Sequence, residues 1–456
     1  MTFALFILYV VLSYIHPAEI VPALAPYAIT YWVGIAGLIL AIGSLVAQRS
    51  GLVANLQLRI LTVFATAMTL SLVIADRWMG APIVAMQRFG PSLAMFVLAM
   101  CSVTSLSRLR LAAGCVIALS VMLALQGAAA YHLGYRTPLF LIDQTTRGDG
   151  PPAVAADDVP EVIEQASDES SVDDADDDAG LEFQRIRGLG MMHDPNDLAL
   201  GLIVALGLIA GVWKATPHWR NVLLAAAAGA LVYGIYLTRS RGGALALVIV
   251  LWRFAAKRAG RVPALILLMT LLIGTTALDF GGRSLSMQPD ESASERIVAW
   301  TEGLEMLKAQ PILGVGYGQF LDHHTLTAHN SLVLCFAETG LVGCFLWVGL
   351  LVVTILELQR LQSLPGDEPF DDMTRQWAEG LQLALTGFMT AAFFLSRTFV
   401  PTLYLIVGLS AALAAIARSS GRPIPLPPLP QLGTFVLASE LGSIGFVYAI
   451  VKLHLS

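Results

Sequence analysis

Long apolar runs recur along almost the whole chain, and they limit the possible folds more than any other feature of the sequence. An α-helix needs about 20 apolar residues to cross the hydrocarbon core of a membrane. Apolar residues make up 56% of the 456 positions and charged residues only 13%, whereas soluble domains carry about 25% charged residues. We therefore expect an all-α, polytopic membrane protein with about 12–13 transmembrane helices.

Polar or basic segments separate the expected spans. The spans lie near residues 2–15, 29–47, 58–75, 85–104, 111–131, 196–213, 221–238, 242–255, 262–279, 331–355, 377–395 and 399–417. A further run, 432–452, is a weaker candidate because Glu440 interrupts it. The first run lacks both a basic leading segment and a small-residue cleavage site, so we do not expect a cleavable signal peptide.

The distribution of Lys and Arg predicts the orientation of the chain. Short loops rich in these residues stay on the cytoplasmic side of a membrane. The basic loops of this chain are 48–57, 105–110, 214–220 and 253–261. They alternate correctly if the N-terminus is cytoplasmic, which places the two long excursions on the outer, periplasmic face.

Six regions follow from this pattern. They are N-terminal transmembrane helices at 1–131, a periplasmic loop with an acidic segment at 132–195, transmembrane helices with an SRGG turn at 196–279, a periplasmic loop with an amphipathic helix and a candidate catalytic His at 280–330, C-terminal transmembrane helices at 331–421, and a Pro-rich linker with a possible last helix at 422–456.

The loop at 132–195 contains an acidic insert. No basic residue lies between Arg147 and Arg185, and that stretch holds 13 of the 33 acidic residues. The remainder of the chain is mildly basic, with 27 Lys and Arg against 20 Asp and Glu. Such acidic runs are typical of solvated, flexible loops. The alternative is a segment that binds cations or a partner.

The stretch 311–340 places polar chemistry at the mouth of an apolar run. Three glycines lie at Gly314, Gly316 and Gly318, and His329 and Asn330 then precede the run. Titratable groups at such a boundary are costly unless they are used. We expect His329 to act as a general base or as a contact to phosphate. A metal site is not expected, because no acidic residue lies near the histidines at ligand spacing.

Arginines gather in the predicted outer loops, where positive charge is disfavoured. Arginine is always charged and binds phosphate oxygens through two parallel hydrogen bonds. Because the chain has no Walker-type phosphate loop, we expect a diphosphate that is carried on a lipid rather than a nucleotide. The alternative is that these side chains anchor the helices or reach the interface. The candidates are Arg239 and Arg241 in TRSRGG, Arg296 in an amphipathic helix ended by Pro311, and Arg185 and Arg187 before the helix start at Asp194-Pro195-Asn196-Asp197.

Four motifs together resemble the O-antigen ligase superfamily, most densely over residues of about 185–400. They are SRGGALA (240–246), ERIVAWTEGLEML (295–307), PILGVGYGQF (311–320) and HNSLVLCFAETGLVG (329–343). The resemblance implies a many-helix, GT-C-like glycosyltransferase at the periplasmic face of a bacterial inner membrane. Such an enzyme takes a glycan from undecaprenyl diphosphate and needs no metal or other cofactor.

The resemblance also implies roles for individual residues. Arg241 and Arg296 correspond to arginines that bind the diphosphate, and His329 corresponds to the histidine that activates the acceptor hydroxyl. The acceptor is lipid A–core in a ligase, another lipid-linked glycan in a polymerase, or a protein hydroxyl in an O-oligosaccharyltransferase. The motifs favour a ligase-like enzyme, and nucleic acid is not an expected partner.

Two other classes of protein remain open from the sequence. A transporter or flippase of lipid-linked glycans would also place arginines in a cavity, but it is expected to carry more charges near the membrane midplane. A scaffold subunit would tolerate replacement of Arg241 and His329. An assay for glycan transfer separates both from an enzyme.

Overall fold

The computed structural model describes residues 1–47, 55–134, 139–144, 183–213, 219–277, 291–366 and 368–455. The acidic insert predicted at 149–182 lies outside the described residues. The first half of the chain forms α1 (Thr2–Ile15), α2 (Pro17–Ile20), η1 (Pro22–Tyr27), α3 (Ile29–Ala47), α5 (Leu56–Asp76), α6 (Ala81–Ser102), α7 (Leu106–Leu133), β1 (Leu141–Gln144), β2 (Phe183–Ile186), η2 (Gly190–Met192) and α8 (Pro195–Val212).

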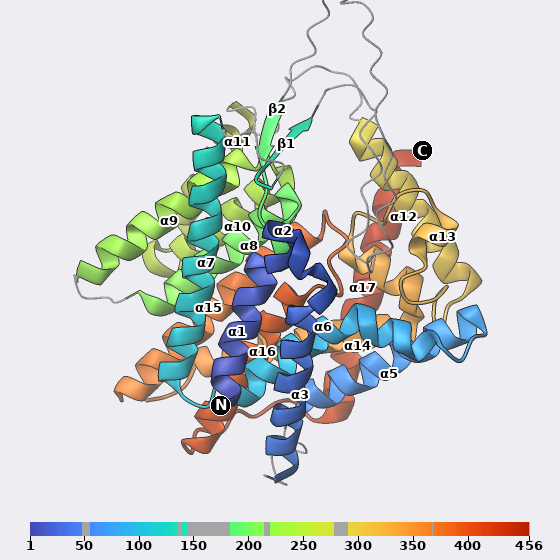
Figure 1. Ribbon diagram of the computed structural model, residues 1–456, viewed down its shortest axis with the longest axis horizontal. Coiled ribbons are helices and arrows are strands. Elements are labelled where there is room, and N and C mark those ends of the chain that lie inside the picture. The colour runs from blue at the N-terminus through green and yellow to red at the C-terminus, as the bar shows by residue number, and fades with distance from the viewer. Residues whose placement is uncertain are drawn as a thin grey trace, which may run out of the picture.

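The regular elements among the described residues of the second half are all helices. Its elements are α9 (Trp219–Leu237), α10 (Arg241–Ala259), α11 (Arg261–Ala277), α12 (Glu291–Ala309), α13 (Phe320–His323), α14 (Ser331–Gln362), α15 (Pro369–Ala392), α16 (Pro401–Ser419) and α17 (Leu429–Leu455). Figure 1 shows α7 and α9 to α11 on one side of the molecule, with α12, α13 and α17 on the other.

Ten helices within the described residues are long and apolar enough to cross a membrane. The chain is therefore an all-α, multi-pass membrane protein, as the apolar runs predict. The doubtful run at 432–452 lies within one of the ten, Leu429–His454. Three other predicted runs fall on α10, α11 and α15, which are not among the ten. Charged residues occupy the first half of α15 and both ends of α10.

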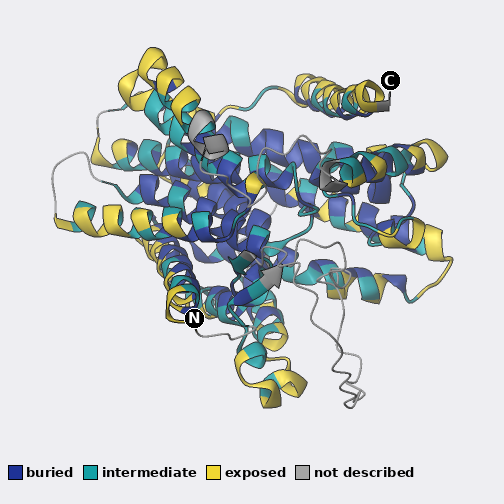
Figure 2. Cartoon of the chain, turned by 90° about the horizontal axis from the view of Figure 1, so that it is seen from above, coloured by how far each residue is buried: buried dark blue, intermediate teal, exposed yellow. Residues whose placement is uncertain are grey.

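The core of the bundle lies around α8 and α16. In each of these helices 83% of the apolar window is buried, against 17–28% in the helices that contain residues 22–44, 219–237 and 429–454. Figure 2 shows the same arrangement, with buried residues concentrated in the central helices and exposed ones on the peripheral helices. The central helices α8 and α16 are therefore surrounded by other helices of the bundle. The outer helices keep apolar surface exposed, which suits contact with lipid.

Several helix ends meet at one end of the bundle. The strands β1 and β2 pair antiparallel, with Leu141 opposite Ile186, and connect the end of α7 to the start of α8. The chain then returns through α9 to the start of α10. Asp194 caps α8, because its side-chain oxygen accepts a hydrogen bond from the backbone N–H of Asn196 at 2.8 Å. This confirms the helix start that the sequence predicts.

Helix α14 is broken at Gly340, and the glycine-rich segment fills the break. Gly340 has φ 63° and ψ −166°, a conformation that is essentially restricted to glycine. The backbone N–H groups of Leu341 and Val342 donate to the carbonyls of Pro311 and Ile312 at 2.9 and 3.2 Å. Backbone groups released by the break are therefore paired with the segment that precedes α13.

The glycine-rich segment also donates hydrogen bonds back to α14 just before the break. The N–H groups of Val315 and Gly316 donate to the carbonyls of Ala337 and Glu338 at 2.9 and 3.2 Å. The Glu338 carboxylate accepts from the N–H groups of Gly318 at 2.9 Å and Phe320 at 3.2 Å. Because glycine has no side chain, Gly314, Gly316 and Gly318 admit a close neighbour. At Gly314, where φ is 71°, that neighbour is the backbone of α14 itself.

We predict that Gly340→Ala destabilises the protein. An L-residue at this φ and ψ costs about 1–3 kcal/mol, and a Cβ atom there would collide with the backbone of Ile312. Thermal unfolding of the purified protein in detergent should show a lower midpoint. Gly349→Ala on the same helix is the control, because its Cβ would make an ordinary contact with Val436 at 3.6 Å. Equal midpoints for the two variants would contradict the role given to the break.

Candidate active site

His329 lies immediately before α14 in a conformation fixed by its neighbour. The side-chain oxygen of Asn330 caps the helix by accepting from the N–H groups of Leu332 at 2.9 Å and Val333 at 3.1 Å. His329 has φ 45°, a left-handed conformation that is uncommon for residues other than glycine, although histidine adopts it more often than most. The backbone therefore turns sharply at the imidazole, and Asn330 holds that turn.

The electrostatic surroundings of His329 favour its neutral form. Burial lowers the pKa of the imidazole below its usual range, and the positive charges of Arg296 and Arg397 lower it further. Asp194 acts in the opposite direction. Side chains from α12, the start of α8 and the segment before α16 therefore influence the imidazole at once. Arg296, predicted from the sequence, and Arg397 are thus the two positive charges that act on the imidazole.

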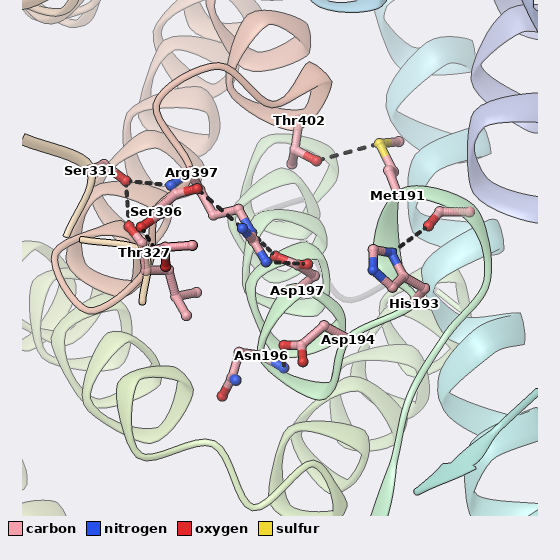
Figure 3. A network of polar contacts seen from close by, with 12 residues as sticks. Met191, His193, Asp194, Asn196, Asp197, Thr327, Ser331, Ser396, Arg397 and Thr402 are labelled. Atoms are coloured by element: carbon pink, nitrogen blue, oxygen red, sulfur yellow. Dashed lines mark hydrogen bonds and ion pairs between the residues drawn. The ribbon is translucent and has the colours of Figure 1, made fainter. Parts of the chain in front are cut away.

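Arg397 is fixed by an ion pair with Asp197 in the first turn of α8. Its guanidinium pairs with both carboxylate oxygens, with Nη2 to Oδ2 at 2.8 Å and Nε in contact with Oδ1. Figure 3 shows the guanidinium directed toward Asp197. The pair is largely shielded, with 9% of the Asp197 side chain and 23% of the Arg397 side chain exposed. It joins residues that are 200 positions apart.

The backbone around Arg397 is tied to the start of α14. The Arg397 N–H donates to the hydroxyl of Ser331 at 2.8 Å, and that hydroxyl donates to the carbonyl of Leu395 at 2.6 Å. The Thr398 hydroxyl donates to the carbonyl of Ser331 at 2.5 Å. The Asp197–Arg397 pair is thus connected to Ser331 at the start of α14, two positions after His329 (Figure 3).

The turn between α9 and α10 holds two of the predicted arginines in different settings. Ser240 caps α10 by accepting from the N–H of Gly243 at 3.1 Å. Arg239 has φ 51° and places its guanidinium 4.5 Å from the centre of the Tyr236 ring. Arg241 begins α10 and is exposed. A Cβ atom on Gly243 would lie 2.8 Å from Ala199, so this glycine allows α10 to pack closely on α8.

Arg185 and Arg187 lie on and just after β2. The Arg185 side chain donates to the carbonyl of Thr238 at 2.8 Å and to the side-chain oxygen of Asn196 at 3.2 Å. It thereby connects the α9–α10 turn to the start of α8. Burial lowers the pKa of Arg185, and Asp194 partly offsets this shift. The Nε atom of Arg187 is buried without a hydrogen bond among the described residues.

The other histidines of this region are placed apart from that network. His323 contacts the carbonyl of Gln319 at 3.0 Å, and His324 that of Leu326 at 2.9 Å. His323 also lines a pocket of about 350 Å³ between the end of α5 and the glycine-rich segment, together with Arg77, Gln310 and Gln319. Within the described ranges, no three His, Cys, Asp or Glu residues are grouped as they would be around a metal ion.

The sequence analysis did not identify Arg397, and it treated Asp194 and Asp197 only as part of a helix start. Arg397 is the single charged residue between two long apolar runs, and that isolation is a signal that could have been used. The Glu338 carboxylate accepts the backbone N–H groups of the glycine-rich segment.

Comparison with known proteins supports the resemblance seen in the motifs. Residues 226–348 match the family O-antigen ligase. This segment includes the α9–α10 turn, α12, the glycine-rich segment and His329. The match supports the O-antigen ligase superfamily, with its glycosyltransferases of the ligase and polymerase type, as the family that this segment is similar to. No curated protein matches the chain.

We predict that Asp197→Ala destabilises the fold strongly. Removal of one partner leaves the other charge shielded and uncompensated, which costs about 3–5 kcal/mol for a buried pair. Unfolding by denaturant in detergent micelles measures the change, and a double-mutant cycle with Arg397→Met isolates the pair. The matched control is Asp372→Ala. Asp372 pairs with Arg375 at i,i+3, and the Asp372 side chain is 67% exposed. The control should cost less than about 1 kcal/mol.

Proposed function

We propose that the protein is a metal-independent glycosyltransferase that moves a glycan from undecaprenyl diphosphate to an acceptor hydroxyl. The reaction takes place at the periplasmic face of a bacterial inner membrane. The acceptor is lipid A–core, as in an O-antigen ligase. The observation that carries the proposal is the neutral-favouring setting of His329 beside two guanidinium groups, at one end of a multi-pass bundle that matches the O-antigen ligase family over residues 226–348.

His329 suits the role of general base. A base must be unprotonated at working pH, and the burial and positive charges that lower the pKa of this imidazole keep it so. The two guanidinium groups suit the opposite role. Positive groups held in a shielded site stabilise the charge that develops on a leaving diphosphate. Arg296 and Arg397 therefore affect both partners of the reaction.

The step balances with the groups at hand. The acceptor oxygen attacks the anomeric carbon of the first sugar and forms the new glycosidic bond. The bond between that carbon and the diphosphate oxygen breaks, and undecaprenyl diphosphate leaves with the electron pair. The acceptor proton passes to His329. Arg296 and the exposed Arg241 bind the diphosphate, while Arg185 and Arg239 shape the turn from which Arg241 extends.

We predict that His329→Ala strongly slows transfer by the purified protein, and that EDTA has no effect on the wild type. Loss of a positioned base lowers the rate by about 10²–10⁴-fold. The donor is the undecaprenyl-diphosphate-linked glycan from the cells that encode the chain. His323→Ala is the matched control, because that imidazole lies outside the network, and it should retain the wild-type rate.

The product identifies the acceptor. A glycan on lipid A–core supports the ligase, whereas a lengthened lipid-linked glycan or a modified protein would replace it with a polymerase or an oligosaccharyltransferase. Movement of the donor across liposomes without formation of any glycosidic bond would reject the enzyme in favour of a transporter.

The pH dependence of kcat/KM provides a second test. Because the pKa of His329 is lowered, the rate should hold as the pH falls through 6.5 and should decline only at lower pH. Asp194→Asn keeps a capping side chain but removes the charge that raises this pKa, so the acidic limb should move to lower pH. Arg296→Gln removes a charge that lowers this pKa, so the acidic limb of its remaining activity should move to higher pH. Identical limbs in all three proteins would exclude His329 as the titrating base.

A further inference from the structure

Three aromatic side chains form a small platform where α7 and α9 end. The aromatic platform consists of His132 in the last turn of α7 together with Tyr233 and Tyr236 in the last turns of α9. The centres of the His132 and Tyr233 rings are 5.9 Å apart and their planes differ by 7°. The Tyr233 and Tyr236 rings are 6.3 Å apart with planes that differ by 22°. The three rings are therefore nearly parallel.

The first two rings lie edge to edge and form one flat surface. The imidazole Nε2 atom of His132 and the hydroxyl of Tyr233 are hydrogen-bonded. If the two parallel rings were stacked face to face, the Nε2 atom and the hydroxyl would be too far apart to form this hydrogen bond. The two ring planes therefore almost coincide. His132 is exposed, and Tyr233 is 41% exposed. The surface is thus accessible and is held flat by its own hydrogen bond.

The platform adjoins the turn between α9 and α10 that holds Arg239 and Arg241, called here the arginine turn. The guanidinium of Arg239 lies 4.5 Å from the centre of the Tyr236 ring. One residue earlier, the carbonyl of Thr238 accepts from Arg185, which also contacts Asn196 at the start of α8. The end of α7 and the start of α8 are joined through β1 and β2, so the platform lies at the same end of the bundle as the Asp197–Arg397 pair.

We propose that the aromatic platform binds a sugar ring of the donor glycan, next to the diphosphate site of the proposed function, on which this inference rests. A pyranose has flat faces of C–H groups and a rim of hydroxyls. Tyrosine and histidine rings offer an apolar face together with polar atoms at the edge, which is the matching chemistry. In the donor, the first sugar is bonded directly to the diphosphate. In the protein, the platform lies directly beside the arginine turn, whose Arg241 is proposed to bind that diphosphate, so a bound donor would bring its sugars to the platform.

Anchoring in the membrane interface is the competing explanation, because Tyr and Trp are enriched there. The chain offers a matched control for it. Tyr31 and Trp32 at the start of α3 are 48% and 61% exposed and contact each other edge to face, with ring centres 5.6 Å apart. Helix α3 packs on α1 and α6 rather than beside the arginine turn. Interface anchoring predicts the same behaviour from both aromatic groups.

The test compares two lipids that differ only in the glycan. Binding to the full-length protein in lipid nanodiscs is measured for undecaprenyl diphosphate and for the undecaprenyl-diphosphate-linked glycan from the cells that encode the chain. Tyr233→Ala and His132→Ala should each weaken binding of the glycan-bearing lipid by about three- to tenfold, the range expected for loss of one ring contact. Binding of the glycan-free lipid should stay within about twofold of the wild type.

Two further variants complete the design. Tyr233→Phe keeps the ring and should retain most of the affinity for the glycan-bearing lipid, and Trp32→Ala should leave both affinities unchanged. Equal weakening of both lipids, or no weakening of either, would overturn the proposal. So would a rise in KM confined to the acceptor. If the wild-type protein binds both lipids but transfers no glycan, the proposed function is wrong. The comparison of the two lipids still tests the platform in that case, because it measures binding and not transfer.

Discussion

The break in α14 is the constraint on which the rest of the structure depends. Inside a membrane protein every backbone N–H and C=O needs a partner, because lipid supplies none. A helix that is interrupted at Gly340 frees such groups, and the segment 311–318 provides their partners through four backbone hydrogen bonds. The Ser71 hydroxyl of α5 lies within hydrogen-bond distance of the carbonyls of both Leu313 and Glu338. The short first half of α14, with His329 at its head, is therefore held on both sides.

The Asp197–Arg397 pair performs a related task with charge. A shielded ion pair contributes little net stability, because the cost of removing two charges from water is close to the attraction gained. Its effect here is on position. The pair joins α8 to the segment before α16, and Ser331 joins that segment to the head of α14. Three parts of the chain that are far apart in sequence are thus held together at the start of α14.

Much of the fold could be predicted from the sequence, because its signals are local. Apolar runs predict the spans, Asp194 and Pro195 predict the start of α8, and Pro311 predicts the end of the helix that carries Arg296. Arg296 lowers the pKa of His329, but a shared site for these two residues stays a prediction. Their chemical roles stay predictions.

The remaining features depend on contacts between distant residues, which composition and spacing do not encode. Arg397 meets a partner 200 positions away, Glu338 meets the backbone of an earlier loop, and His132 meets Tyr233 across 101 positions. The glycines show the same limit. Their number predicts a close approach, but the neighbour at Gly314 is the chain's own helix, which only the tertiary fold reveals.

The sequence separation within the ion pair has a consequence for biosynthesis. Asp197 enters the membrane with α8, and Arg397 is made 200 residues later. At about 5–20 residues per second, this interval lasts roughly 10–40 s. During that time the carboxylate is without its guanidinium, so the head of α8 has to remain at the aqueous boundary or carry a proton until the final helices arrive. The completion of this site is therefore one of the last events in the assembly of the chain.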